Sequence, residues 1–204
     1  MQNFLSLTAL VLFFACSALK NNSINEPSKI LANIDLIDIK DDKVQISVSP
    51  SRVENDEIIF YIPQIVPGTY EYSNFGRFIE NLKAFDKKGN LLPVESLDKN
   101  SWRIYKAKKL SKLTYMANDT FDGPDGGNEI YPMGGTNFKE NDTFLLNLHS
   151  MVGYFEGMKE IPYHLSIVSP KKLKSFTSLP TISQSDSLDI FLAKRYFHII
   201  DNPI

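Results

Sequence analysis

The chain has 204 residues, a length that fits one domain, or one domain with an appendage, and hardly accommodates a two-domain enzyme. Its 43% hydrophobic and 12% aromatic content is enough for a sizeable core, which excludes a wholly disordered chain. Lysine and arginine number 22 against 24 aspartate and glutamate, and a net charge of −2 argues against nucleic acid as a partner. One cysteine and three scattered histidines provide little material for a metal site.

The N-terminus has the character of an export signal. Residues 4–15 are uncharged and almost wholly apolar, but they fall short of the roughly 20 residues of a membrane-spanning helix. The run ends at Ala15-Cys16 and the chain then turns polar, which resembles a bacterial lipoprotein signal in which an acylated cysteine becomes the first mature residue. We expect a signal peptide over residues 1–15, a lipidated Cys16 and a flexible tether over residues 16–29.

This interpretation predicts an exported, membrane-anchored lipoprotein on the periplasmic or cell-surface side. Its first partner is then the membrane itself, reached through the lipid on Cys16. A plain signal peptide with an incidental cysteine is the alternative.

Beyond the tether, alternating apolar and polar residues predict a series of β-strands. In chain order, strands are expected at residues 30–36, 44–48, 57–62, 79–85, 91–94, 101–105, 112–117, 144–148 and 163–168. Gly89-Asn90 supplies the turn of a hairpin. A helical spacing occurs at residues 189–197. The pattern predicts an all-β fold: an antiparallel β-sandwich-like domain over residues 30–204 with one long loop and a short C-terminal helix.

The long loop covers residues 118–141 and has no periodicity. A loop of this length is usually functional or disordered. Its acids do not follow the spacing of an EF-hand, so turns made by its Asp-Gly and Gly-Gly pairs are expected rather than a calcium site. Aromatic residues such as Phe121 and Phe138 predict that the loop packs on the body of the domain.

The sequence lacks three common catalytic and phosphate-binding motifs. It has no HExxH, no GxSxG and no phosphate-binding loop. His149 and His164 fall in predicted strands, where a structural role is expected, and His198, with Asp201 three residues on, has no evident nucleophile nearby. We therefore predict no catalytic residue, no metal ligand and no cofactor in this chain.

Four stretches follow one another in a recognisable order. They are Pro67-Gly68-Thr69-Tyr70 with Phe75-Gly76-Arg77, the hairpin at 84–90 with Trp102, the pair of segments 133–138 and 153–157, and the terminal segment 196–204 with Asp201-Asn202-Pro203-Ile204. Together they resemble the N-terminal domain of the glycyl aminopeptidase family, metallopeptidase family sixty-one, over residues 30 to 204. In that family, zinc and the HExxH helix belong to a thermolysin-like domain that follows this one.

The resemblance implies a non-catalytic β domain that packs on a catalytic peptidase domain, its partner, and helps to shape the substrate cleft. The parent protein would be a zinc aminopeptidase, with zinc only in the missing domain, and this chain a truncated form that ends at the linker. Candidate interface or cleft residues are Pro67, Gly68 and Tyr70 in the turn and Asp201, Asn202 and Pro203 in the linker.

Pro67 and Gly68 fit a type II turn that exposes Tyr70 at a strand end, although a Tyr70 in the core is equally compatible. If a partner is missing, we expect residues 67–70 and 196–204 to contribute to an apolar patch. The alternative function is a stand-alone, lipid-anchored binding module whose 118–141 loop contacts a protein or a glycan.

Overall fold

The computed structural model describes residues 28–66, 68, 71–121, 130, 134–140 and 142–204. The expected signal peptide, Cys16 and the tether as far as residue 27 lie outside these residues. The strands are β1 (Ile30–Lys40), β2 (Lys43–Ser49), β3 (Glu57–Tyr61), β4 (Ile79–Asp86), β5 (Leu91–Leu92), β6 (Val94–Ser96), β7 (Ser101–Tyr105), β8 (Leu110–Asn118), β9 (Asn137–Lys139), β10 (Thr143–Leu145), β11 (Tyr154–Phe155), β12 (Tyr163–Val168), β13 (Thr181–Gln184) and β14 (Leu188–Ala193). The helices are α1 (Tyr196–Ile200) and the 3₁₀ turns η1 (Phe75–Phe78), η2 (Ala107–Lys109) and η4 (Leu148–Ser150).

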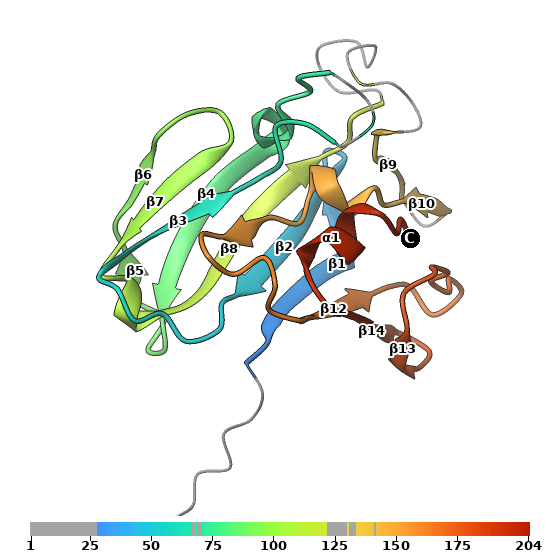
Figure 1. Cartoon of the computed structure of the whole chain (residues 1–204). Helices are drawn as coiled ribbons and strands as arrows, with labels where there is room; N and C mark the ends of the chain where they lie inside the picture. Colours follow the sequence, from blue (N-terminus) through green and yellow to red (C-terminus); the bar gives the residue numbers. More distant parts are fainter. Residues whose placement is uncertain (1–27, 67, 69–70, 122–129, 131–133, 141) are drawn as a thin grey trace, which may run out of the picture.

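The larger layer of the domain is an eight-stranded sheet in the order β13-β14-β12-β1-β2-β8-β4-β5 (Figure 1). Its strands form because every second side chain is apolar and buried on one face. One row of the register joins Ile34 to Ile46 and Ile167, and Ile46 to Tyr115, so that four strands contribute to a single buried layer. The pair β1–β12 is parallel, and the other strand pairs of the described residues are antiparallel.

A second sheet, in the order β11-β3-β7-β6, covers part of the inner face. The ring of Phe60 on β3 lies 5.7 Å from the ring of Tyr115 on β8 and 5.1 Å from that of Phe155 on β11. Trp102 is half-buried and packs against the same core at 6.5 Å from Phe60. The prediction of an all-β, sandwich-like fold is therefore confirmed.

The C-terminal helix is confirmed as an element, but its predicted position was wrong. Residues 188–193 form strand β14, and the helix spans only Tyr196–Ile200. The strand was not predicted because of Asp189, which faces inward and is 1% exposed. An apolar residue at this position would have completed the alternation of a strand.

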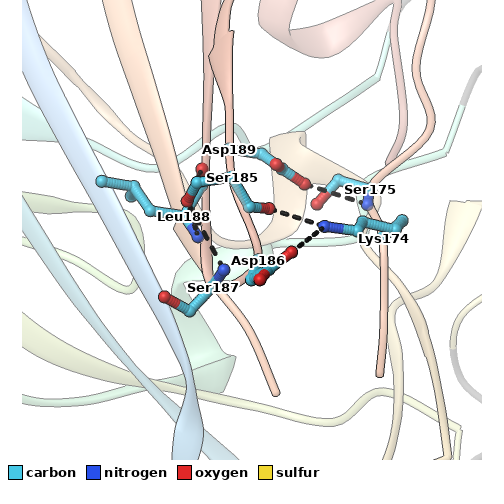
Figure 2. A network of polar contacts seen from close by, with 7 residues as sticks. All are labelled: Lys174, Ser175, Ser185, Asp186, Ser187, Leu188 and Asp189. Carbon is cyan, nitrogen blue, oxygen red and sulfur yellow. Dashed lines mark hydrogen bonds and ion pairs between the residues drawn. The ribbon is translucent and has the colours of Figure 1, made fainter. Parts of the chain in front are cut away.

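The buried carboxylate of Asp189 is satisfied at one oxygen, while Oδ1 has no hydrogen-bond partner among the described residues (Figure 2). Its Oδ2 accepts a hydrogen bond of 3.1 Å from the backbone N–H of Ser175. Next to it, the ammonium group of Lys174 donates to the carbonyl of Ser185 at 2.7 Å and lies 3.5 Å from Asp186. These contacts tie residues 174–175 to the β13–β14 hairpin.

The strand predicted at residues 144–148 was also only partly right. Strand β10 ends at Leu145, and His149 lies in the 3₁₀ turn η4 instead of a strand. In the part of the chain that the structure describes, none of the helices has the length and apolar character needed to cross a bilayer.

Candidate functional site

The turn after β3 carries the first candidate residues. Gly68 is exposed and has φ of 93°, a conformation that favours glycine over residues with a side chain. Pro67 and Tyr70 lie outside the described residues. On either side of them the side chains of Ile65 and Tyr72 are 38% and 67% exposed. The turn thus presents apolar groups to solvent at the end of a strand.

A pocket of about 380 Å³ lies beside this turn. The described residues that line it are Val66, Gly68, Glu71, Ser73, Phe75, Ile130 and Gly134. The turn and the 118–141 loop, which the sequence presented as separate features, therefore form walls of the same pocket. Its lining is mostly apolar with one carboxylate and one hydroxyl, a composition typical of surfaces that receive another molecule's side chain.

The turn is held in place by the segment that leads into η1. The backbone N–H of Asn74 donates to the carbonyl of Gln64 at 3.0 Å, and the side-chain oxygen of Asn100 accepts from the N–H of Gly76 at 3.0 Å. At Gly76 a Cβ atom would lie 2.0 Å from the carbonyl oxygen of Lys99, so only glycine fits. Phe75-Gly76 is therefore a structural requirement of the pocket wall.

The base of the long loop is fixed by buried polar contacts. Asp119 is 2% exposed, and its carboxylate accepts hydrogen bonds from the backbone N–H groups of Phe121 and Phe138. The side chain of Thr136 bonds to Ser150 at 2.6 Å and to the Asn147 carbonyl at 3.2 Å. Asp119 therefore stabilises the loop, and Phe138 packs in the core as predicted. The described residues contain no group of three or more His, Cys, Asp or Glu side chains suited to a metal ion.

His149 joins this pocket to the rest of the domain. It is 3% exposed, and its ring meets the ring of Phe75 edge-on at 4.9 Å. Its Nε2 donates to the carbonyl of Gly134 at 2.8 Å, while Nδ1 has no hydrogen-bond partner among the described residues. Burial lowers the pKa of His149, and the backbone groups of Gly134 and Ile200 oppose that shift. The imidazole is therefore neutral at neutral pH.

The C-terminal candidates lie on the other side of η4. Asp201 and Pro203 are exposed, and the side-chain amide of Asn202 donates to the carbonyl of His198 at 2.8 Å. Ile204 exchanges two backbone hydrogen bonds with Leu146, of 2.8 and 3.1 Å. Both α1 and η1 contact η4, but among the described residues Gly68 and Ile204 line different pockets. The structural role expected for His149 agrees with its burial and its hydrogen bond, but nothing in the neighbouring sequence indicates that three segments meet there.

The chain matches the model described as the Peptidase M61 N-terminal domain over residues 32–204. An aminopeptidase N family protein from Idiomarina loihiensis has a similar structure, with a TM-score of 0.71 and 25% sequence identity over 85% of this chain and 28% of that chain. The present chain therefore spans little more than a quarter of that protein.

More distant structures are similar as well. An M1 zinc metallopeptidase from Deinococcus radiodurans matches with a TM-score of 0.43 and 7% identity over 82% of this chain and 38% of that chain. A mutant of that enzyme bound to a Tyr-Ser-Ala substrate gives a TM-score of 0.43 and 8% identity over the same shares. A search of curated proteins finds no match.

Proposed function

Because the chain belongs to the Peptidase M61 N-terminal domain family, we propose that it is the non-catalytic β domain of an exported zinc aminopeptidase. In this proposal the domain packs on a thermolysin-like catalytic domain and helps to shape its substrate cleft. The similarity to an aminopeptidase N family protein, of which this chain covers 28%, supports a larger parent protein.

The pocket beside Gly68 is the observation that carries the packing proposal. Exposed Ile65 and Tyr72 flank a mostly apolar hollow whose walls come from two separate segments. Contacts between domains of one chain bury roughly 600 to 1,500 Å², and contiguous apolar surface of this kind marks such contacts. We assign this face to the catalytic domain.

Zinc belongs to the partner in this proposal. Bound there, it would polarise the peptide carbonyl and activate water. The described residues of this chain lack a ligand set for it, so their contribution is to form a wall of the cleft and to exclude water from it.

Substitutions at the turn test the proposed packing. Ile65→Ser with Tyr72→Ser, introduced into the native gene, should lower the aminopeptidase activity and the thermal midpoint of the native protein, because both remove apolar area from the contact. Leu91→Ser is the matched control, since Leu91 is 65% exposed at the opposite end of the sheet. Equal effects of the two changes would contradict the assigned face, and a native protein with no peptidase activity at all would favour the lipid-anchored binding module.

We also propose that Cys16 is acylated and that the mature protein is anchored on the exported side of a membrane. The abrupt change from the apolar run ending at Ala15 to the polar tether supports this. Mass spectrometry of protein expressed in a bacterial host measures it directly. A mature N-terminus elsewhere, or an unmodified Cys16 thiol, would refute the anchor.

A further inference from the structure

We propose that the end of the eight-stranded sheet at which β1 begins is a membrane-facing surface that binds anionic lipid headgroups. This inference rests on one part of the proposed function, the lipid anchor at Cys16, and not on the peptidase activity. It is carried by two independent observations: the strand register places one set of turns at this end, and those turns are rich in exposed basic residues.

The register shows which turns meet there. Leu31, near the start of β1, lies opposite Ser49 at the end of β2. Val48 lies opposite Leu113 near the start of β8, and Leu113 lies opposite Ala84 near the end of β4. With strands about 4.8 Å apart, the turns of β4 and β8 lie within roughly 15 Å of the β1 start. Figure 1 shows β1 starting and β4 ending at the same, lower end of the sheet.

Exposed lysines collect in these turns. The turns at 87–90 and 106–109 carry Lys87, Lys88, Lys106, Lys108 and Lys109. On the other side of β1, the chain before β12 and after β14 adds Lys159, Lys194 and Arg195. The acidic residues in or directly beside these turns are Glu54, Asp56, Glu57, Asp86, Glu156 and Glu160.

Ion pairs neutralise only part of this charge. Lys108 pairs with Asp56 at 3.1 Å, and Arg195 lies 3.7 Å from Glu160. The eight basic side chains named for this end outnumber the six acidic ones, so the surface keeps a positive charge. A chain with an overall charge of −2 therefore has one end with a net positive charge.

The opposite end of the sheet carries charges of both signs. Its described turns hold Asp41, Asp42, Glu71, Asp98, Asp119 and Asp186, against Arg77, Lys99, Lys171, Lys172 and Lys174. A negatively charged surface would attract the lysine-rich end more strongly than this mixed end, so the charge distribution favours one orientation of the domain.

The position of Cys16 selects a membrane as the source of that negative charge. Cys16 lies 14 positions before Ile30, which limits their separation to about 50 Å even for a fully extended chain. An acyl chain on Cys16 would hold the domain within this distance of the bilayer, and the tether joins the domain at its lysine-rich end. The Gly68 pocket lies at the opposite end and would face away from the membrane, where a catalytic domain can reach it.

Vesicle binding tests this surface. The full chain, prepared in a bacterial host, is partitioned onto vesicles of phosphatidylcholine with and without phosphatidylglycerol, and the ratio of the two partition coefficients is measured. Lys87→Gln, Lys88→Gln and Lys109→Gln together should lower the ratio by roughly tenfold or more, because each lysine at an anionic surface contributes about a fivefold factor. The control combines Lys99→Gln, Lys171→Gln and Lys172→Gln, which remove the same charge from exposed positions away from this end.

The outcomes separate this proposal from the lipid anchor. We expect the ratio of partition coefficients to decrease strongly for the first triple variant and to change little for the control. Added salt should weaken the preference for anionic vesicles. No preference of the wild type for anionic vesicles, or equal decreases for the two variants, would overturn the surface. The mass of Cys16 in the same preparation reports acylation separately, so an unmodified Cys16 with intact charge dependence would refute the anchor and leave the surface standing.

Discussion

Three buried tyrosines hold one short segment of backbone. The hydroxyl groups of Tyr115, Tyr196 and Tyr163 donate to the carbonyls of three consecutive residues, 151, 152 and 153, at 2.9, 2.7 and 3.3 Å. Burial raises the pKa of each of these tyrosines, so they stay neutral donors. The tyrosines come from β8, α1 and β12, and they fix η4, and with it His149, against the large sheet.

Removal of one hydroxyl group should therefore cost stability. Tyr196→Phe leaves the buried carbonyl of Val152 without its donor, and we expect a loss of about 1 to 3 kcal/mol in the free energy of unfolding. Urea denaturation measures it. Tyr72→Phe, at an exposed hydroxyl, should change the free energy by less than about 0.5 kcal/mol; similar losses for the two variants would show that the buried hydrogen bond contributes nothing.

His149 should make the stability depend on pH. Its folded-state pKa lies below the ordinary value of 6.5, so the unfolded chain binds more protons in the interval between the two values. Stability is therefore full above about pH 6.5 and decreases as the pH falls below it. Denaturant midpoints at a series of pH values should show this decrease for the wild type. In His149→Gln, which keeps a donor for Gly134, the curve should be flatter above about pH 5, and an unchanged curve would contradict the role of His149.

At the scale of elements, alternation predicted most of the strands because their inner and outer residues differ clearly. Strands β2 and β8 alternate between buried and exposed side chains. The parallel pairing of β1 with β12 was not predictable, since it joins residues about 130 positions apart and depends on packing rather than on local pattern. Strand β13 escaped prediction because all four of its side chains are exposed at the sheet edge.

The candidate site was predicted only in part. Glycine and proline identified the turn at Gly68, because the positive φ there is a local requirement. The pocket depends on Ile130 and Gly134 meeting that turn, and on His149 beneath it, and such contacts are set by tertiary packing. Residues 196–204 were expected to contribute to an exposed apolar patch. The side chain of Phe197 is exposed, but Ile200 and Ile204 pack against the core.

The C-terminal segment is thus expected to stabilise this domain. Ile200→Ser with Ile204→Ser should lower the free energy of unfolding by about 2 kcal/mol or more, because two half-buried side chains lose their apolar contacts. Ile37→Ser, at an exposed position of β1, is the control. Thermal melts combined with light scattering distinguish the outcomes. An unchanged melt with reduced self-association would show instead that the segment forms an exposed partner surface.

At the scale of the whole molecule, the two proposed surfaces lie at opposite ends of the large sheet. One end carries the lysine-rich turns near the start of β1, and the other carries the Gly68 pocket. Between them the tyrosine cluster and His149 fix the long loop and α1 to one core. This arrangement suits a domain that stands between a membrane and a catalytic partner.

The most direct test of the account is to isolate the native protein from its host with an antibody against this domain. Its mass, its zinc content and its release of amino acids from an aminoacyl reporter are then measured beside the 204-residue chain produced by itself. We expect the domain to be recovered with a catalytic partner, in one polypeptide or a stable complex, with stoichiometric zinc and metal-dependent aminopeptidase activity, while the 204-residue chain shows neither zinc nor activity. Recovery of the domain without any peptidase, or stoichiometric zinc and hydrolysis in the 204-residue chain itself, would contradict it.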